Sequence, residues 1–329
     1  GGVRLKLDAN SRISLSNNGG TDTTVFGYQA LNAGIGGSDV RYSVAVGHRA
    51  LMSEDSTDAC TAIGYSALST QNQTGVTANT GVGYQASMNN ETGTNNTSLG
   101  YRALKGTDNH SNNTAIGANA MLDVTTGNEN VAIGSHAMYN STTGYDTVAI
   151  GREAIGLRVY TGSDNTVVGK GAGYDLTSAT NNTILGRAAG ANLTDNADNV
   201  VIGFQAFYTA NSGENENVVI GKHAGYYIDN ASADENVIIG KGAGQGGSGD
   251  LSGCIVIGAN ALDATGSNDH TGAIAIGHQA LTALTSGTYN VAVGWNSLDA
   301  CTTGSVNTAV GSGALGGTDD GIGNVAIGA

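Results

Sequence analysis

Apolar and polar residues alternate along this 329-residue chain in a pattern that repeats from about Thr23 to its last residue. Two neighbouring copies are NTAIGANAM (Asn113 to Met121) and NVAIGSHAM (Asn130 to Met138). We call the glycine of each copy its anchor and number the other positions of the repeat from it. Ten of the seventeen intervals between anchors are 17 residues long and the rest are 18 to 20. The eighteen anchors are Gly27, Gly47, Gly64, Gly83, Gly100, Gly117, Gly134, Gly151, Gly169, Gly186, Gly203, Gly221, Gly240, Gly258, Gly277, Gly294, Gly311 and Gly328.

Four positions of the repeat accept few residue types. Position −1 is apolar and position −3 is β-branched in all eighteen copies, as Ile116 and Thr114 illustrate. Residues two apart share one face of a strand, and β-branched side chains favour strands, so we expect these two rows to fill the core. Position −4 is Asn in twelve copies, which predicts a ladder of stacked side-chain amides. Position +3 is Ala in sixteen of seventeen copies, which predicts a crowded site.

Two further regularities concern glycine. Position +4 is usually a large apolar residue, but it is glycine in four copies whose position −2 is enlarged to Val or Ile. This exchange predicts that positions −2 and +4 share one layer of the core. A glycine also recurs ten residues after the anchor, which predicts a corner with positive φ. The glycines of the first set are Gly173, Gly190, Gly225 and Gly244, and those of the second are Gly93, Gly127, Gly144, Gly213, Gly287 and Gly304.

A repeat of about 17 residues with β-branched positions and polar turns fits one coil of a parallel β-solenoid, because helical repeats need about 30 residues or more. We therefore expect an all-β solenoid of about 18 coils, roughly 85 Å long at about 4.8 Å per coil. Residues 1–22 would form lead-in strands, and residues 23–329 a single elongated domain. So thin a coil would leave a flat side in need of cover, which a homotrimer would supply. The last repeat stops on an apolar strand, so we expect the array to continue in further sequence or by end-to-end stacking of copies.

Composition supports this interpretation and excludes other classes of protein. The chain has 53 glycines, no proline and 5% aromatic residues, so small residues must pack its core. A net charge of −14 argues against nucleic-acid binding, and no apolar run is long enough to span a membrane. Three cysteines indicate no disulfide framework. Two of them, Cys60 and Cys254, occupy position −4 in place of asparagine, which predicts a small packing residue; the third is Cys301.

The N[TV]AIGxxAL unit resembles the repeats of trimeric autotransporter adhesin heads. The array also resembles cyanophage tail-fibre and virion structural proteins, with a lead like LDANSRISLSNN (Leu7 to Asn18) running into TVFGYQAL (Thr24 to Leu31). The resemblance implies a left-handed parallel β-roll that assembles as a homotrimer. It covers nearly the whole chain. The repeat is longer than the adhesin unit, and the sequence has neither stalk heptads nor a C-terminal membrane anchor.

The sequence contains no motif of a known catalytic or metal site. We interpret His48 and His278, both near an anchor, as solvated side chains. The acids of SEDSTD (Ser53 to Asp58), GENEN (Gly213 to Asn217) and TDDG (Thr318 to Gly321) are expected to be solvated turn residues, with glycosidase carboxylates or calcium ligands as the alternatives. A row of tyrosines at position +1 could cover the edge of the roll or bind sugar: Tyr28, Tyr65, Tyr84 and Tyr101. Ice binding is disfavoured because the threonines at position −3 should face inward.

One group of basic residues is a candidate binding site. Positions +1 of successive coils carry five cations interrupted by Phe204. Stacked cations repel one another unless they are compensated. They could pair with turn acids of the same or a neighbouring chain, or form a stripe for an anionic polysaccharide of a host surface. The stripe is Arg152, Lys170, Arg187, Lys222 and Lys241.

These observations predict a structural protein that is not an enzyme and needs no cofactor or metal. We expect the shaft of a phage tail fibre or virion appendage, a rigid spacer outside the cell that supports host recognition. Its partners would be other fibre or baseplate proteins or further copies of itself. The alternatives are a surface adhesin head that binds host ligands directly, a filament-forming extracellular protein and, third, a capsule depolymerase.

Overall fold

The computed structural model describes residues 13–15, 23–32, 40–53, 57–72, 75–107, 109–156, 158–247, 249, 251–266, 268–317 and 320–329. These residues form strands and turns but no helix, and the strands of successive repeats pair in parallel. The predicted all-β parallel solenoid is therefore confirmed. Contacts divide the chain into two compact units, Gly1–Thr161 and Gly162–Ala329. The expectation of one domain over residues 23–329 stays a prediction.

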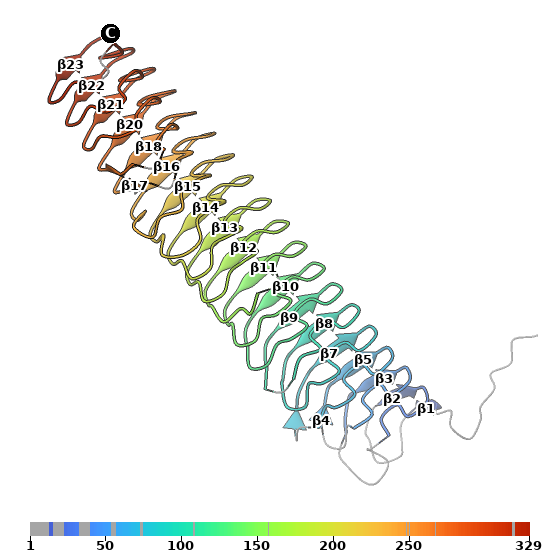
Figure 1. The fold of residues 1–329 in the computed structure, drawn as a ribbon. Coiled ribbons are helices and arrows are strands. Elements are labelled where there is room, and N and C mark those ends of the chain that lie inside the picture. Colours follow the sequence, from blue (N-terminus) through green and yellow to red (C-terminus); the bar gives the residue numbers. More distant parts are fainter. Residues whose placement is uncertain are drawn as a thin grey trace, which may run out of the picture. The chain divides into compact units, whose positions relative to one another are not determined.

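In the first unit, each repeat contributes one three-residue strand directly before its anchor (Figure 1). Each strand pairs in parallel with that of the next coil, so that equal positions of the repeat lie side by side. β1 (Ile13–Leu15) pairs antiparallel with the first of them, and it is the described part of the predicted lead-in. Outside this ladder, β4 (Thr57–Asp58) pairs with β6 (Gly75–Val76). The ladder strands are β2 (Thr24–Phe26), β3 (Val44–Val46), β5 (Thr61–Ile63), β7 (Thr80–Val82), β8 (Thr97–Leu99), β9 (Thr114–Ile116), β10 (Val131–Ile133) and β11 (Val148–Ile150).

The second unit is built in the same way (Figure 1). Its strands also pair in parallel, position against position. Outside the ladder, β17 (Leu251–Ser252) pairs with β19 (His270–Thr271). The ladder strands are β12 (Thr166–Val168), β13 (Thr183–Leu185), β14 (Val200–Ile202), β15 (Val218–Ile220), β16 (Val237–Ile239), β18 (Ile255–Ile257), β20 (Ile274–Ile276), β21 (Val291–Val293), β22 (Thr308–Val310) and β23 (Val325–Ile327).

The strand face that fills the core is the opposite of the predicted one. In β9 the buried residue is Ala115 at position −2, whereas Thr114 and Ile116 are only half-buried and point outward. The same pattern holds in every ladder strand except β23, whose middle residue is half-buried. The interior of a coil this narrow accepts small side chains, and the larger β-branched pair is left on the outer face. The prediction that positions −3 and −1 fill the core was therefore wrong.

The predicted asparagine ladder is confirmed. Asn130 is fully buried, and its backbone N–H and Nδ2 both donate to Oδ1 of Asn113 on the preceding coil, at 3.0 and 3.2 Å. Its Nδ2 also donates to the carbonyl of Gly144 at 2.7 Å. Where Cys254 takes the position, its thiol donates to the carbonyl of His270 at 3.0 Å. Where position −4 is asparagine, the ladder thus binds a coil to its neighbour and to its own return segment.

The volume exchange is also confirmed, with a third participant. A Cβ added to Gly190 would lie 2.6 Å from Cδ1 of Leu193 and 3.5 Å from Cδ1 of Ile184. The glycine at position +4 therefore makes room for an enlarged residue at position −2 and for a leucine three residues later. Gly173 has the same neighbours in Leu176 and Val167.

Glycine serves close approach as well as turning, since all eighteen anchors have φ between 126 and 143°. A Cβ on the anchor Gly117 would lie 2.5 Å from the carbonyl oxygen of Gly134 on the next coil. Of the glycines ten residues after an anchor, Gly213 and Gly287 have positive φ, but the other four do not. At one of these four, Gly127, a Cβ would lie 2.5 Å from the oxygen of Gly144. The predicted positive-φ corner is therefore wrong for those four glycines. At Gly127 the carbonyl oxygen of the next coil lies too close for a Cβ atom.

Candidate functional site

The outward face of the ladder strands is a candidate surface in each unit. It carries two rows, the β-branched residues of position −3 and the apolar residues of position −1. Side chains such as Ile63 and Leu99 in the first unit and Leu185 in the second are exposed by 40%, 47% and 46%. Monomeric proteins rarely expose contiguous apolar patches of more than a few hundred Å². The threonines of position −3 face outward, contrary to the expectation on which ice binding was disfavoured. An ice-binding Thr-x-Thr array is still missing, because position −1 is apolar throughout.

Beside this face, position +1 of the first unit forms a continuous stack of aromatic rings. Neighbouring ring centroids are 5.0 to 5.3 Å apart, and the planes differ by 2 to 25°. The three inner rings therefore have both faces covered, while Tyr28 and Tyr101 at the ends of the stack have a ring on one face. A sugar stacks on an open ring face, so this row favours an edge-covering role. The stack consists of Tyr28, His48, Tyr65, Tyr84 and Tyr101.

The histidines differ from the prediction at one of the two positions. His48 is sandwiched between Tyr28 and Tyr65, and its Nδ1 is buried, so interpreting it as a solvated side chain was wrong. His278 is exposed, as expected, and lies 6.5 Å from the ring of Trp295. Among the described residues, no three His, Cys, Asp or Glu side chains come together in a way that could hold a metal ion.

In the second unit, position +1 carries the predicted basic row. Lys170, Arg187, Lys222 and Lys241 follow β12, β13, β15 and β16, and all four are exposed. Their carbonyls accept hydrogen bonds from the next coil, which fixes the spacing of the row; the donors are the backbone N–H groups of Ala188, Gln205, Gly242 and Asn260. Phe204 fills the gap, with Cζ of Arg187 at 4.7 Å and Nζ of Lys222 at 5.9 Å from its ring centroid.

The four cations of the second unit have no acidic partner within the described part of the chain. No ion pair forms there between any of them and a carboxylate. Burial, followed by the charges of Lys222 and Lys241, lowers the pKa of the neighbouring His223. This part of the row therefore presents a local positive charge on an acidic protein. Pairing with turn acids of the same chain, one of the two interpretations from the sequence, is not found for these four residues.

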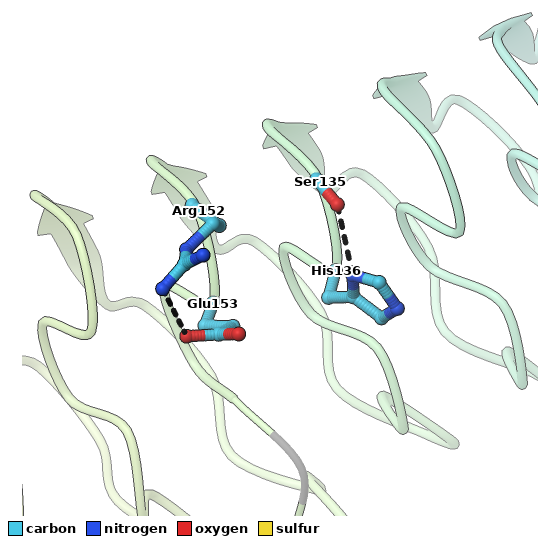
Figure 2. Close-up of polar contacts among 4 residues, drawn as sticks. All are labelled: Ser135, His136, Arg152 and Glu153. Atoms are coloured by element: carbon cyan, nitrogen blue, oxygen red, sulfur yellow. Dashed lines mark hydrogen bonds and ion pairs between the residues drawn. The ribbon is translucent and has the colours of Figure 1, made fainter.

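Arg152, the fifth predicted cation, belongs to the first unit. Its Nη2 lies 3.5 Å from Oε2 of Glu153, and the two side chains are 56% and 33% exposed (Figure 2). One coil earlier, Ser135 Oγ and His136 Nδ1 make the corresponding contact between positions +1 and +2, at 2.8 Å (Figure 2). An ion pair this exposed contributes little to stability.

A row of acids lies at position −5; one of its members, Glu216, belongs to the GENEN segment that was expected to hold solvated turn acids. In the second unit the row comprises Asp164, Asp198, Glu216 and Glu235, all exposed and with φ between 57 and 60°. In the first unit the row continues as Glu129 and Asp146. A hydrogen bond with Asp146, and then repulsion between the two carboxylates, raise the pKa of Glu129. The signal was available, because position −5 holds Asp or Glu in six of seven successive repeats from Glu129 to Glu235.

One predicted turn acid is not solvated. Glu214 of the GENEN segment is fully buried, and its Oε2 accepts a hydrogen bond from Nδ2 of Asn196 at 2.7 Å. Burial raises the pKa of its carboxyl group above the ordinary value. The segments SEDSTD and TDDG lie partly outside the described residues. A surface hollow of about 270 Å³ in the first unit is lined by Arg102, Lys105 and Asp123 among others. Asp123 is the one carboxylate among its described lining residues, whereas glycoside hydrolysis needs a pair.

No model of a known protein family and no curated protein matches the sequence. Among the residues that the structure describes, there is no helix of the length and apolar character that crossing a membrane requires.

Proposed function

We propose that the chain is the shaft of a phage tail fibre or a related virion appendage, assembled as a homotrimer of left-handed β-rolls. Its task is mechanical: it holds a host-recognition element away from the particle. The observation that carries the proposal is the outward strand face, whose two exposed rows accompany the ladder through the coils of each unit. A cover for such a face must repeat at the same spacing, and another copy of the chain does so.

The stacking contacts suit a load-bearing spacer. Within each unit, successive coils are joined by backbone hydrogen bonds and by anchor glycines in direct contact, and the buried asparagine ladder adds side-chain hydrogen bonds where position −4 is Asn. Stability in such arrays is the sum of each repeat and its contacts with neighbours, so length can be added without a new core. An enzyme is the weaker proposal, because the charged residues of positions −5 and +1 lie in rows along the coils, and the lining described for the hollow of the first unit has one carboxylate.

A surface adhesin head is the second candidate, and the basic row of the second unit is the observation that favours it. In that case the exposed cations would bind an acidic polysaccharide of the host directly. An extracellular filament built from end-to-end copies is a further alternative that uses the same fold.

The test is immunogold electron microscopy with antibodies against the purified chain, applied to virus particles and to bacterial cells from the same source. The proposal expects gold along fibres of the virus particles. Label on the bacterial surface with none on particles would reject the phage shaft and support the adhesin head.

A further inference from the structure

Positions −5 and +1, which flank each strand, carry matched residues coil by coil. Four of the five coils with a cation at +1 have an acid at −5. Six of the eight coils with an aromatic or imidazole ring at +1 have a neutral residue at −5, and the other two pair Asp22 with Tyr28 and Asp198 with Phe204. The charged pairs are Asp146 with Arg152, Asp164 with Lys170, Glu216 with Lys222, and Glu235 with Lys241. The neutral pairs are Tyr42 with His48, Ala59 with Tyr65, Ala78 with Tyr84, Asn95 with Tyr101, Gly272 with His278, and Tyr289 with Trp295.

Among the described residues of these two positions, three charged residues have no match in their own coil: Glu129, whose +1 residue is Ser135, and Arg187 and Asp198 in neighbouring coils. Arg187 has a neutral Asn181 in its own coil, but its guanidinium packs on Phe204 of the next coil at 4.7 Å. The coil of Phe204 carries Asp198 at position −5, and Nδ2 of Asn181 donates to Oδ1 of Asp198 at 3.0 Å. Arg187 therefore reaches toward the next coil, which is the coil that carries Asp198 at position −5.

Within one chain these matched residues cannot meet. They lie at opposite ends of a strand, and the three strand residues alone span about 10 Å. In the described part of the second unit no ion pair joins the two rows. A match between positions that do not touch in one molecule indicates contact between molecules.

We propose that the start of each strand in one copy lies against the end of the corresponding strand in the next copy, so that position −5 of one chain faces position +1 of its neighbour. This inference rests on the homotrimer of the proposed function. Three strand faces turned toward a common axis form a triangle whose corners are these contacts. Thr, Val and Ile side chains of positions −3 and −1 fill its centre.

The arrangement also explains how each chain tolerates rows of like charge. Cations stacked about 4.8 Å apart repel one another, and in the acidic row the neighbouring Asp146 raises the pKa of Glu129. Placing an acidic row beside a basic row neutralises both along the same edge. A single exposed ion pair contributes only about 0–1 kcal/mol, so the apolar face supplies most of the affinity and the charged rows set which edges meet.

The test uses a carbodiimide, which joins an amine to a carboxylate only where the two touch. In the wild-type protein, Lys222 and Glu216 of neighbouring copies should become linked, giving covalent trimers on a denaturing gel. A mixture of isotopically labelled and unlabelled chains, assembled together and analysed by mass spectrometry, distinguishes links between chains from links within one chain. The triple variant Lys170→Arg, Lys222→Arg, Lys241→Arg keeps the charge but cannot react, and it should lose the covalent trimer. The matched control Lys105→Arg should keep it.

Light scattering of the same samples separates the two proposals. A trimer in solution whose chains are not linked, or whose links persist in the triple variant, overturns the strand-end contact and leaves the shaft intact. A monomer overturns both. A row that binds an acidic polysaccharide predicts no link between chains, together with retention of the wild type on a polygalacturonate resin and not on neutral dextran. That result also overturns the contact.

Discussion

Replacing one rung of the buried asparagine ladder tests whether it stabilises the stack of coils. In Asn130→Ala the carbonyl of Gly144 loses its donor and the N–H of Thr147 loses its acceptor, Oδ1 of Asn130 at 3.1 Å. Both residues are buried, so no water replaces the lost partners. A buried polar group left without a partner costs about 1–3 kcal/mol. Two such groups predict a loss of about 2–6 kcal/mol in the free energy of unfolding.

The assay is urea unfolding followed by circular dichroism, with hydrogen exchange of the Thr147 amide as a local measure. Asn211→Ala is the control, because Asn211 is exposed and makes no side-chain hydrogen bond among the described residues; its loss should stay below about 0.5 kcal/mol. Asn130→Cys should fall between the two, as Cys254 shows that a thiol can donate at this position. Equal stability of Asn130→Ala and the control would refute the reasoning.

Three other substitutions test the packing of single positions. Gly117→Ala places a Cβ 2.5 Å from the oxygen of Gly134 at a φ of 135°. The substitution should lower the free energy of unfolding by more than about 4 kcal/mol. Thermal unfolding close to the wild-type midpoint would contradict the close stacking of the anchors. Gly190→Ala should lower the midpoint because its Cβ meets Leu193 at 2.6 Å, and adding Leu193→Ala should recover part of the loss; additive losses would refute the volume exchange. A carboxyl group whose pKa is raised in the folded state stabilises the folded protein below the unfolded pKa of about 4.3. This contribution to stability is lost as the pH rises through the pKa of the folded state. Glu214→Gln should therefore be more stable than the wild type at pH 7, by about 1 kcal/mol, with no gain at pH 4; equal stability of the two proteins at pH 7 in urea titrations would contradict the burial argument.

The sequence predicted the period, the parallel strands and the asparagine ladder, because each follows from residue types that recur at fixed positions. It did not predict which strand face is buried. Both faces of the repeat are regular, and Thr114 and Ile116 are larger and more strand-forming than Ala115. Alternate residues of a strand point to opposite faces. Because Asn113 at position −4 is buried, position −2 lies inside and positions −3 and −1 lie outside.

The candidate site was predicted in part. The basic row was visible because its cations share position +1, and the structure places Lys170 to Lys241 along one line of exposed side chains in the second unit. The acidic row was missed, since its members sit in turns rich in Asp and Asn, where acids are common. The stacking of His48 between two tyrosines depends on the register of three coils and on ring orientation, which no local pattern specifies.

The central claim is that other copies of the chain cover the outward strand face. An electron cryo-microscopy reconstruction of the purified protein, viewed along the stack of coils, tests it most directly. The account predicts three copies with the rows of Thr114 and Ile116 turned toward a common axis, and with Lys222 of each copy beside Glu216 of the next. A single copy, or an assembly that leaves these rows facing solvent, would contradict it.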